Sequence, residues 1–234
     1  MLAFVAGGLV KGTLGVGLPL VAVPILSMVL PTPVAMGLLA FPVMASNVWQ
    51  AIDAKPTRAD LRRFAPMYAT LMIATALTVS LSASMTTREL NLAMAGVIVL
   101  AVVLMASNPT LSVPPGRERL IGTIVGAIGG ALGGVSSLTG PIMIMYLVSL
   151  RLGRERFVGT ISIGYLLGGI PLYIGMIAIG RLGWTQFLLS VVAMLPIFVG
   201  MRLGKALRGR ISEAWFRRAL LVVLLVTAVV LVFK

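Results

Sequence analysis

The sequence predicts an all-α polytopic membrane protein made of two pseudo-symmetric, inverted halves, and three observations carry that prediction. Of the 234 residues, 59% are hydrophobic, and the mean hydropathy is +1.08. Only 11% are charged, and these lie between long apolar runs, most of them close to the roughly 20 residues that a helix needs to cross a bilayer. Two of the runs are interrupted by glycine and proline, one near the start of each half. We therefore expect one integral membrane domain.

Taken in order, the apolar runs predict the same set of segments twice. The first half, residues 1–110, is an interrupted run followed by three spans: 1–30, 34–52, 64–84 and 90–106. The second half, residues 111–234, repeats that order: 120–150, 157–179, 184–201 and 214–233. The polar, proline-rich stretch 107–116 is the expected boundary between the halves.

The interruption in the second half is the more pronounced of the two. As one helix, residues 120–150 would rise roughly 45 Å, against a hydrocarbon core of about 30 Å. The stretch 126–141 reads GAIGGALGGVSSLTGP, and glycine and proline there weaken the helical hydrogen-bond ladder. Exposed backbone is tolerated in lipid only where it is buried in protein or lines a wet cavity. The sequence therefore predicts two short helices that meet at a polar break.

The first half carries a weaker copy of this interruption, KGTLGVGLP at residues 11–19. Placing Gly12 on Gly130 also matches Gly15 with Gly133, and Pro19 then falls near Pro141 after a short length difference. Paired interrupted segments in corresponding positions of two halves point to the binding site of a transporter.

The distribution of basic residues favours hairpins over full crossings at the two interruptions. If each interrupted segment crosses once, the basic residues divide ten against seven. If each returns to its own side, fifteen share one side and only Arg88, Arg181 and Lys234 face the other, which agrees with the positive-inside rule. Hairpins that enter from opposite faces make the halves inverted; whether they are re-entrant or fully spanning stays open. The fifteen are Lys55, Arg58, Arg62, Arg63, Arg117, Arg119, Arg151, Arg154, Arg156, Arg202, Lys205, Arg208, Arg210, Arg217 and Arg218.

The residues at the breaks predict an anion site. The six acidic residues fall in loops or at span ends, whereas a cation carrier or a proton relay would bury a carboxylate. The breaks instead offer hydroxyls, a lysine and free backbone N–H groups at helix starts, which suit small oxyanions. The candidate substrate-binding residues are Lys11, Thr13, Gly15, Gly17, Asn47, Gln50, Ser136, Ser137, Thr139 and Gly140.

Each candidate also has a purely structural interpretation. Ser136, Ser137 and Thr139 can bond back to their own helix, and Lys11 can extend to the membrane interface. Asn47 and Gln50 can join helices, and the glycine pairs 129–130 and 133–134 resemble small-residue helix packing.

Composition also predicts which partners and cofactors to expect. The formal net charge of +13 reflects basic loops, so we expect a lipid bilayer around the protein and no nucleic acid partner. With neither Cys nor His, no disulfide, metal site or other cofactor is expected. No signal peptide is expected near Met1, and the sequence leaves the oligomeric state open.

The motifs resemble the TauE/SafE family of sulfite and sulfonate transporters, also called the toluene-sulfonate uptake permease family. The run GTLGVGLPLVAVP at 12–24 is similar to that family's glycine-rich first segment, and FVGTIS at 157–162 is similar to its Ala-x-Gly-Thr-Ser pattern. The first copy of that pattern, AMGLLA at 35–40, departs from it, with Leu38 and Leu39 in place of Thr and Ser. The resemblance covers nearly the whole chain and implies movement of sulfite, sulfoacetate or another sulfonate across the bacterial inner membrane.

The expected function is thus a secondary carrier of small anions, acting as an exporter. A monoanion that leaves a cell with a negative interior gains about 2.3 kcal/mol per 100 mV, so export needs no coupled ion. The alternatives are a passive anion channel and an uptake carrier coupled to H⁺ or Na⁺. An enzyme is not expected, because the membrane interior lacks the usual nucleophiles and general bases.

Overall fold

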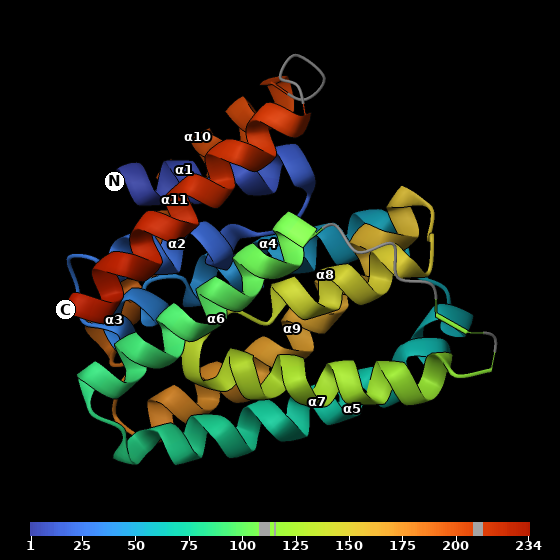
Figure 1. Cartoon of the computed structure of the whole chain (residues 1–234), viewed down its shortest axis with the longest axis horizontal. Helices are drawn as coiled ribbons and strands as arrows, with labels where there is room; N and C mark the ends of the chain where they lie inside the picture. Colours follow the sequence, from blue (N-terminus) through green and yellow to red (C-terminus); the bar gives the residue numbers. More distant parts are fainter. Residues whose placement is uncertain (108–112, 115, 208–212) are drawn as a thin grey trace.

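The computed structural model describes residues 1–107, 113–114, 116–207 and 213–234, except for the side chains of 213–217, and its regular structure there is entirely helical (Figure 1). The all-α prediction is confirmed. The first half contains α1 (Leu2–Leu14), α2 (Leu18–Ser27), α3 (Thr32–Gly37), α4 (Ala40–Ala54), α5 (Arg58–Leu81), the 3-10 turn η1 (Ser82–Ser84) and α6 (Thr87–Ser107). The second contains α7 (Glu118–Ser136), α8 (Gly140–Ser149), α9 (Arg154–Ala178), α10 (Trp184–Leu207) and α11 (Glu213–Phe233).

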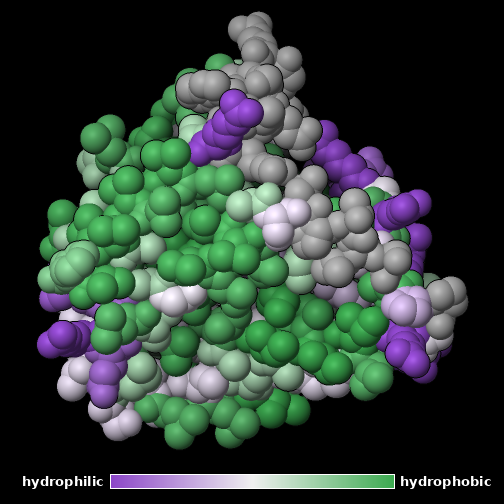
Figure 2. All heavy atoms as spheres, in the orientation of Figure 1, coloured by the Kyte–Doolittle hydropathy of each residue, from purple (hydrophilic) through white to green (hydrophobic). Residues whose placement is uncertain are grey.

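The outer surface of this bundle is that of a multi-pass membrane protein. Six of the described helical segments are long and apolar enough to cross a bilayer. Large apolar side chains lie exposed along them, including Leu77 on α5, Ile174 on α9 and Leu195 on α10. Figure 2 shows a broad hydrophobic surface over one face, with hydrophilic residues gathered toward its edges. An apolar surface of this extent is explained by contact with lipid rather than with water.

The two interrupted segments fold back on themselves. In Figure 1, α1 and α2 both have their outer ends toward the left, and α7 and α8 both have theirs toward the right. The arms of each pair pack against each other. The turns between them are short: residues 15–17 and residues 137–139. We call these turns break 1 and break 2.

Break 2 starts later than the sequence suggested. The glycine-rich stretch does not interrupt the helix, because α7 continues for 19 residues to Ser136. An arm of that length can by itself cross a bilayer, whereas α1 has only 13 residues. The expected span at 34–52 lies within Thr32–Ala54, one of the six candidate spans, which consists of α3 and α4 with an interruption at Leu38 and Leu39.

The glycines of α7 serve helix packing. A Cβ at Gly126 or Gly130 would lie 2.1–2.3 Å from the Met67 or Leu71 carbonyl oxygen of α5, and one at Gly134 would lie 2.0 Å from Thr78 Oγ1. The helical axes approach this closely only because no side chain stands between them. For Gly130 and Gly134, the small-residue packing interpretation is therefore correct.

The arm α1 is held in the same way by α10. A Cβ at Gly8 would lie 2.3 Å from the Ile197 carbonyl oxygen, and one at Gly204 would lie 2.2 Å from the Leu9 carbonyl oxygen. Each hairpin thus packs its first arm on a helix of the other half, since α1 lies on α10 and α7 on α5.

The division of the chain at about residue 110 stays a prediction, as does the inverted relation of the halves. The proposed boundary, 107–116, lies largely outside the described residues, and so does the loop 208–212 with its basic residues.

Candidate functional site

The two breaks line one small cavity in the interior of the bundle. Its volume is about 10 Å³, close to the least that holds one water molecule. Both helix starts, α2 and α8, border it. The lining residues are Gly17, Pro19, Leu20, Ser137, Leu138, Gly140, Ile144 and Tyr165. Of the predicted site residues, the cavity therefore brings together Gly17, Ser137 and Gly140.

Break 2 is shaped by hydroxyl residues. Ser137 has a left-handed backbone (φ 62°), unfavourable for any residue with a Cβ, and its N–H donates to the Gly133 carbonyl at 2.7 Å. Ser136 Oγ donates to the Leu132 carbonyl at 2.6 Å and accepts from the Leu138 N–H at 3.2 Å. Ser136 thus bonds back to its own segment. Thr139 precedes α8, but its hydroxyl makes no cap hydrogen bond there.

Break 1 is shaped by glycine and fixed by an amide. Gly15 and Gly17 have φ of 84° and 92°, which glycine adopts without strain. Gln50 Nε2 on α4 donates to the Gly15 carbonyl at 2.8 Å, and Gln50 Oε1 accepts from Ser162 Oγ on α9 at 3.2 Å. Gln50 therefore joins break 1 to the two helices beside it.

Lys11 is a buried lysine one turn before break 1. Its side chain is 2% exposed, and its Nζ donates to Asn47 Oδ1 at 2.8 Å. Asn47 Nδ2 donates in turn to the Val43 carbonyl at 2.8 Å. Neither ion pair recorded for the described part of the chain includes Lys11. The expectation that Lys11 extends to the interface is wrong, because its ammonium group stays inside the bundle.

Thr13 lies on the packing side of α1. Its Oγ1 donates to the Leu9 carbonyl at 2.8 Å and to the Gly204 carbonyl of α10 at 3.3 Å. These bonds give Thr13 a role in joining α1 to α10.

Two tyrosines of α9 lie beside break 2, and the sequence analysis missed both. Tyr165 lines the cavity, and a Cβ at Gly140 would lie 2.6 Å from its hydroxyl. Tyr173 lies two turns further along α9, with its hydroxyl near Ser137. Their spacing of eight residues places them on one face of the helix, and that spacing was a signal available in the sequence.

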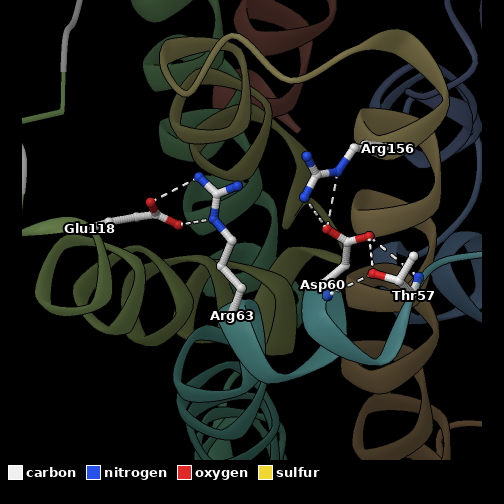
Figure 3. Close-up of polar contacts among 5 residues, drawn as sticks. All are labelled: Thr57, Asp60, Arg63, Glu118 and Arg156. Atoms are coloured by element: carbon white, nitrogen blue, oxygen red, sulfur yellow. Dashed lines mark hydrogen bonds and ion pairs between the residues drawn. The ribbon is translucent and has the colours of Figure 1, made fainter.

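A second, larger cleft opens where α5 and α9 begin. Its volume is about 430 Å³. Figure 3 shows the polar contacts here: Thr57 and Asp60 form a capping box, and Arg156 reaches Asp60 from α9. Beside them Arg63 Nη2 donates to Glu118 Oε2 at 2.8 Å. The lining residues are Ala54, Lys55, Pro56, Thr57, Asp60, Glu155, Arg156, Gly159 and Thr160.

Helix α9 connects this cleft to the central cavity. Gly159, in the cleft, lies against Ala54 of α4, and one turn deeper Ser162 bonds Gln50. Tyr165, in the cavity, comes one turn later. At the far end Arg181 Nη2, in the loop after α9, donates to the Met85 carbonyl at 3.0 Å, and Nη1 to Ser82 Oγ at 3.2 Å. The molecule is thus more open at the Asp60 end than at the Arg181 end.

The described residues contain no group of three or more His, Cys, Asp or Glu side chains placed to hold a metal ion. The polar groups near the breaks are hydroxyls, amides and one ammonium group, which suit an anionic ligand.

Comparison with known proteins gives one result. Residues 1–231 match the family model described as sulfite exporter TauE/SafE. No curated protein and no solved structure matches the chain.

Proposed function

The chain belongs to the sulfite exporter TauE/SafE family, and we propose on that premise that it is a secondary carrier of small oxyanions or organosulfonates such as sulfite or sulfoacetate. The anion binds between break 1 and break 2. The family is one of membrane transporters, and a multi-pass fold suits that role.

Lys11 is the observation that carries this proposal. An isolated charge is costly inside a protein within a membrane, and such charges are kept where function needs them. Asn47 supplies a hydrogen bond to Lys11 but no negative charge. An anionic substrate supplies a charge that neither ion pair of the described residues provides to Lys11.

Break 2 adds hydrogen-bond donors and a favourable electrostatic end. Ser137 and Gly140 border the cavity at the start of α8, where the helix presents free N–H groups and a partial positive charge. Substrate contact by Thr139 belongs to the proposal, whereas Asn47 and Gln50 already bond within the protein and take a supporting role. A supporting role is also left for three residues that make hydrogen bonds within the protein: Thr13, Gly15 and Ser136.

The size of the cavity favours a carrier over a channel. A space that holds about one water molecule does not admit sulfite, so the site must enlarge to load and unload. A carrier does this by opening to one side at a time. The larger cleft at the Asp60 end is then the vestibule of the side that is open.

The membrane orientation follows from the basic loops and is part of the proposal. The loops with Lys55, Arg63 and Arg156 face the cytoplasm by the positive-inside rule, in the inner membrane. The halves are inverted repeats, as the recurring pairs α1 on α10 and α7 on α5 suggest. Export follows the membrane potential.

The test is sulfite counterflow in proteoliposomes with Lys11→Met. The wild type should show saturable exchange, and Lys11→Met should lower the initial rate roughly 10- to 100-fold, the size of a lost hydrogen bond from a charged donor. Lys205→Met is the matched control, because Lys205 is exposed at the end of α10. Flux that rises linearly with concentration would indicate a channel, and no flux of sulfite or any sulfonate would overturn the proposal.

A further inference from the structure

We propose that Tyr173 is a specificity-determining residue, whose hydroxyl donates a hydrogen bond to the bound oxyanion beside Ser137. This inference rests on the proposed function, because it assigns one more donor to the same site.

The first observation is that the Tyr173 hydroxyl is buried without a partner. The residue is 7% exposed, and its Oη makes no hydrogen bond of ordinary geometry within the described part of the chain, although the Ser137 side chain lies near it. Buried hydroxyls in proteins are nearly always paired, since an unpaired one loses its bonds to water without replacement. An unpaired hydroxyl beside a helix break of a transporter therefore points to a ligand that accepts its hydrogen bond.

The second observation is the contrast with two other tyrosines of the chain. Tyr68 Oη donates to the Thr160 carbonyl at 2.9 Å, and Tyr146 Oη donates to the Glu118 carbonyl at 3.1 Å. Both are buried tyrosines away from the breaks, and both are satisfied by the backbone. Among the described residues the fold thus gives these two tyrosine hydroxyls a backbone carbonyl as acceptor, whereas the Tyr173 hydroxyl has no backbone acceptor.

The ring of Tyr173 has little freedom to carry its hydroxyl to water. It belongs to the main apolar core, together with Met36, Leu138 and Met176. The hydroxyl is consequently held in place before any ligand arrives. A donor fixed in advance binds at a lower entropic cost than one that must be ordered.

An oxyanion completes the arrangement. Ser137 and Tyr173 each offer an O–H donor, and a sulfite or sulfonate group presents several oxygens that accept from both at once. A chloride ion has no separate oxygens to divide between two donors. A site built to hydrogen-bond its ligand rejects an analogue that leaves those donors unpaired.

The experiment compares Tyr173→Phe with Tyr146→Phe in the purified full-length protein. Sulfite and chloride affinities are measured by calorimetry, and thermal unfolding is followed without ligand. Tyr173→Phe should weaken sulfite binding at least about tenfold, reduce the preference for sulfite over chloride, and leave the unfolding temperature unchanged or higher. Tyr146→Phe should leave sulfite affinity within about twofold and lower the unfolding temperature, because it removes a hydrogen bond to the Glu118 carbonyl.

The outcomes separate the two proposals. If the wild type binds sulfite and Tyr173→Phe binds it equally well, this inference falls and the proposed function stands. Equal losses in both variants, or a Tyr173→Phe protein that fails to fold, would give the hydroxyl a structural role and also overturn the inference. If the wild type binds neither sulfite nor any sulfonate, the proposed function falls and takes the inference with it.

Discussion

Break 1 and break 2 each join the two arms of a hairpin, yet they are built differently. Break 1 uses glycine at both left-handed positions, and Gln50 holds its exposed carbonyl. Break 2 places Ser137 in a left-handed conformation, and within the described residues the nearby Tyr173 hydroxyl makes no hydrogen bond of ordinary geometry. The first break is held by a side-chain amide, while the second has an unpaired hydroxyl donor beside it.

The difference suggests a division of labour within one cavity. Under the proposed function, Lys11 beside break 1 supplies the positive charge. Break 2, with the α9 tyrosines, supplies the directional donors under the same proposal. A residue held in a strained conformation among unpaired donors is typical of functional sites. Two interruptions with similar sequences therefore need not have equal roles.

The largest effect should come from the packing that holds both breaks in place. Alanine at Gly12 would put a Cβ 2.2 Å from the Met201 carbonyl oxygen, and alanine at Gly130 would put one 2.3 Å from the Leu71 carbonyl oxygen. Each variant should lose about 3 kcal/mol of unfolding free energy, since rigid backbone cannot yield to the added methyl group. Thermal unfolding monitored by size-exclusion chromatography measures this. Gly96→Ala, which meets nothing within 4 Å, is the control, and similar behaviour of all three variants would contradict the expectation.

A loss of unfolding free energy of intermediate size should come from the amide that holds break 1. Gln50→Leu removes the donor to the Gly15 carbonyl and the acceptor for Ser162. It should cost about 1–3 kcal/mol of unfolding free energy, because a buried carbonyl is left unpaired. Gln186→Leu serves as the control, because Gln186 accepts only an exposed bond from the Gly183 N–H. A loss from Gln50→Leu no larger than that of the control would mean that break 1 does not depend on this amide.

The smallest expected changes in unfolding free energy have opposite signs at the two breaks. A residue with a Cβ costs about 1–2 kcal/mol in the left-handed region, so Ser137→Gly should raise the unfolding free energy by up to about 1 kcal/mol. Gly17→Ala should lower it by about 1–2 kcal/mol for the same reason. The stabilised Ser137→Gly protein should still bind sulfite more weakly, because it lacks the hydroxyl. Stabilisation accompanied by unchanged affinity would remove Ser137 from the site.

Much of the fold followed from hydropathy and spacing, and the exceptions have physical causes. The spans and both interruptions were predicted because lipid imposes length and apolar composition on each helix. The exact start of break 2 was not, because glycine permits a break but does not require one. In α7 the close approach of α5 uses those glycines while the helix continues.

The site was predicted in part for a similar reason. Residues next to the breaks, such as Gly17 and Ser137, were identified because the interruption itself marks them. Tyr165 and Tyr173 were missed because tyrosine in an apolar span is also an ordinary interfacial or core residue. Only the packing of α9 against break 2 distinguishes a tyrosine beside the candidate site from an ordinary interfacial or core tyrosine.

The packing of α1 on α10 has a consequence for the order in which the protein assembles during synthesis. The glycine face of α1 is complete only once α10 has been synthesised, and Gly12 and Met201 are far apart in the chain. At about 5–20 residues per second, ribosomes need roughly 10–40 s to cover that interval. During this delay the first hairpin sits in the membrane, or at the insertion machinery, without its partner. Assembly of this protein is therefore a late event in translation, and its N-terminal arm depends until then on lipid or on a chaperone to cover its bare glycine surface.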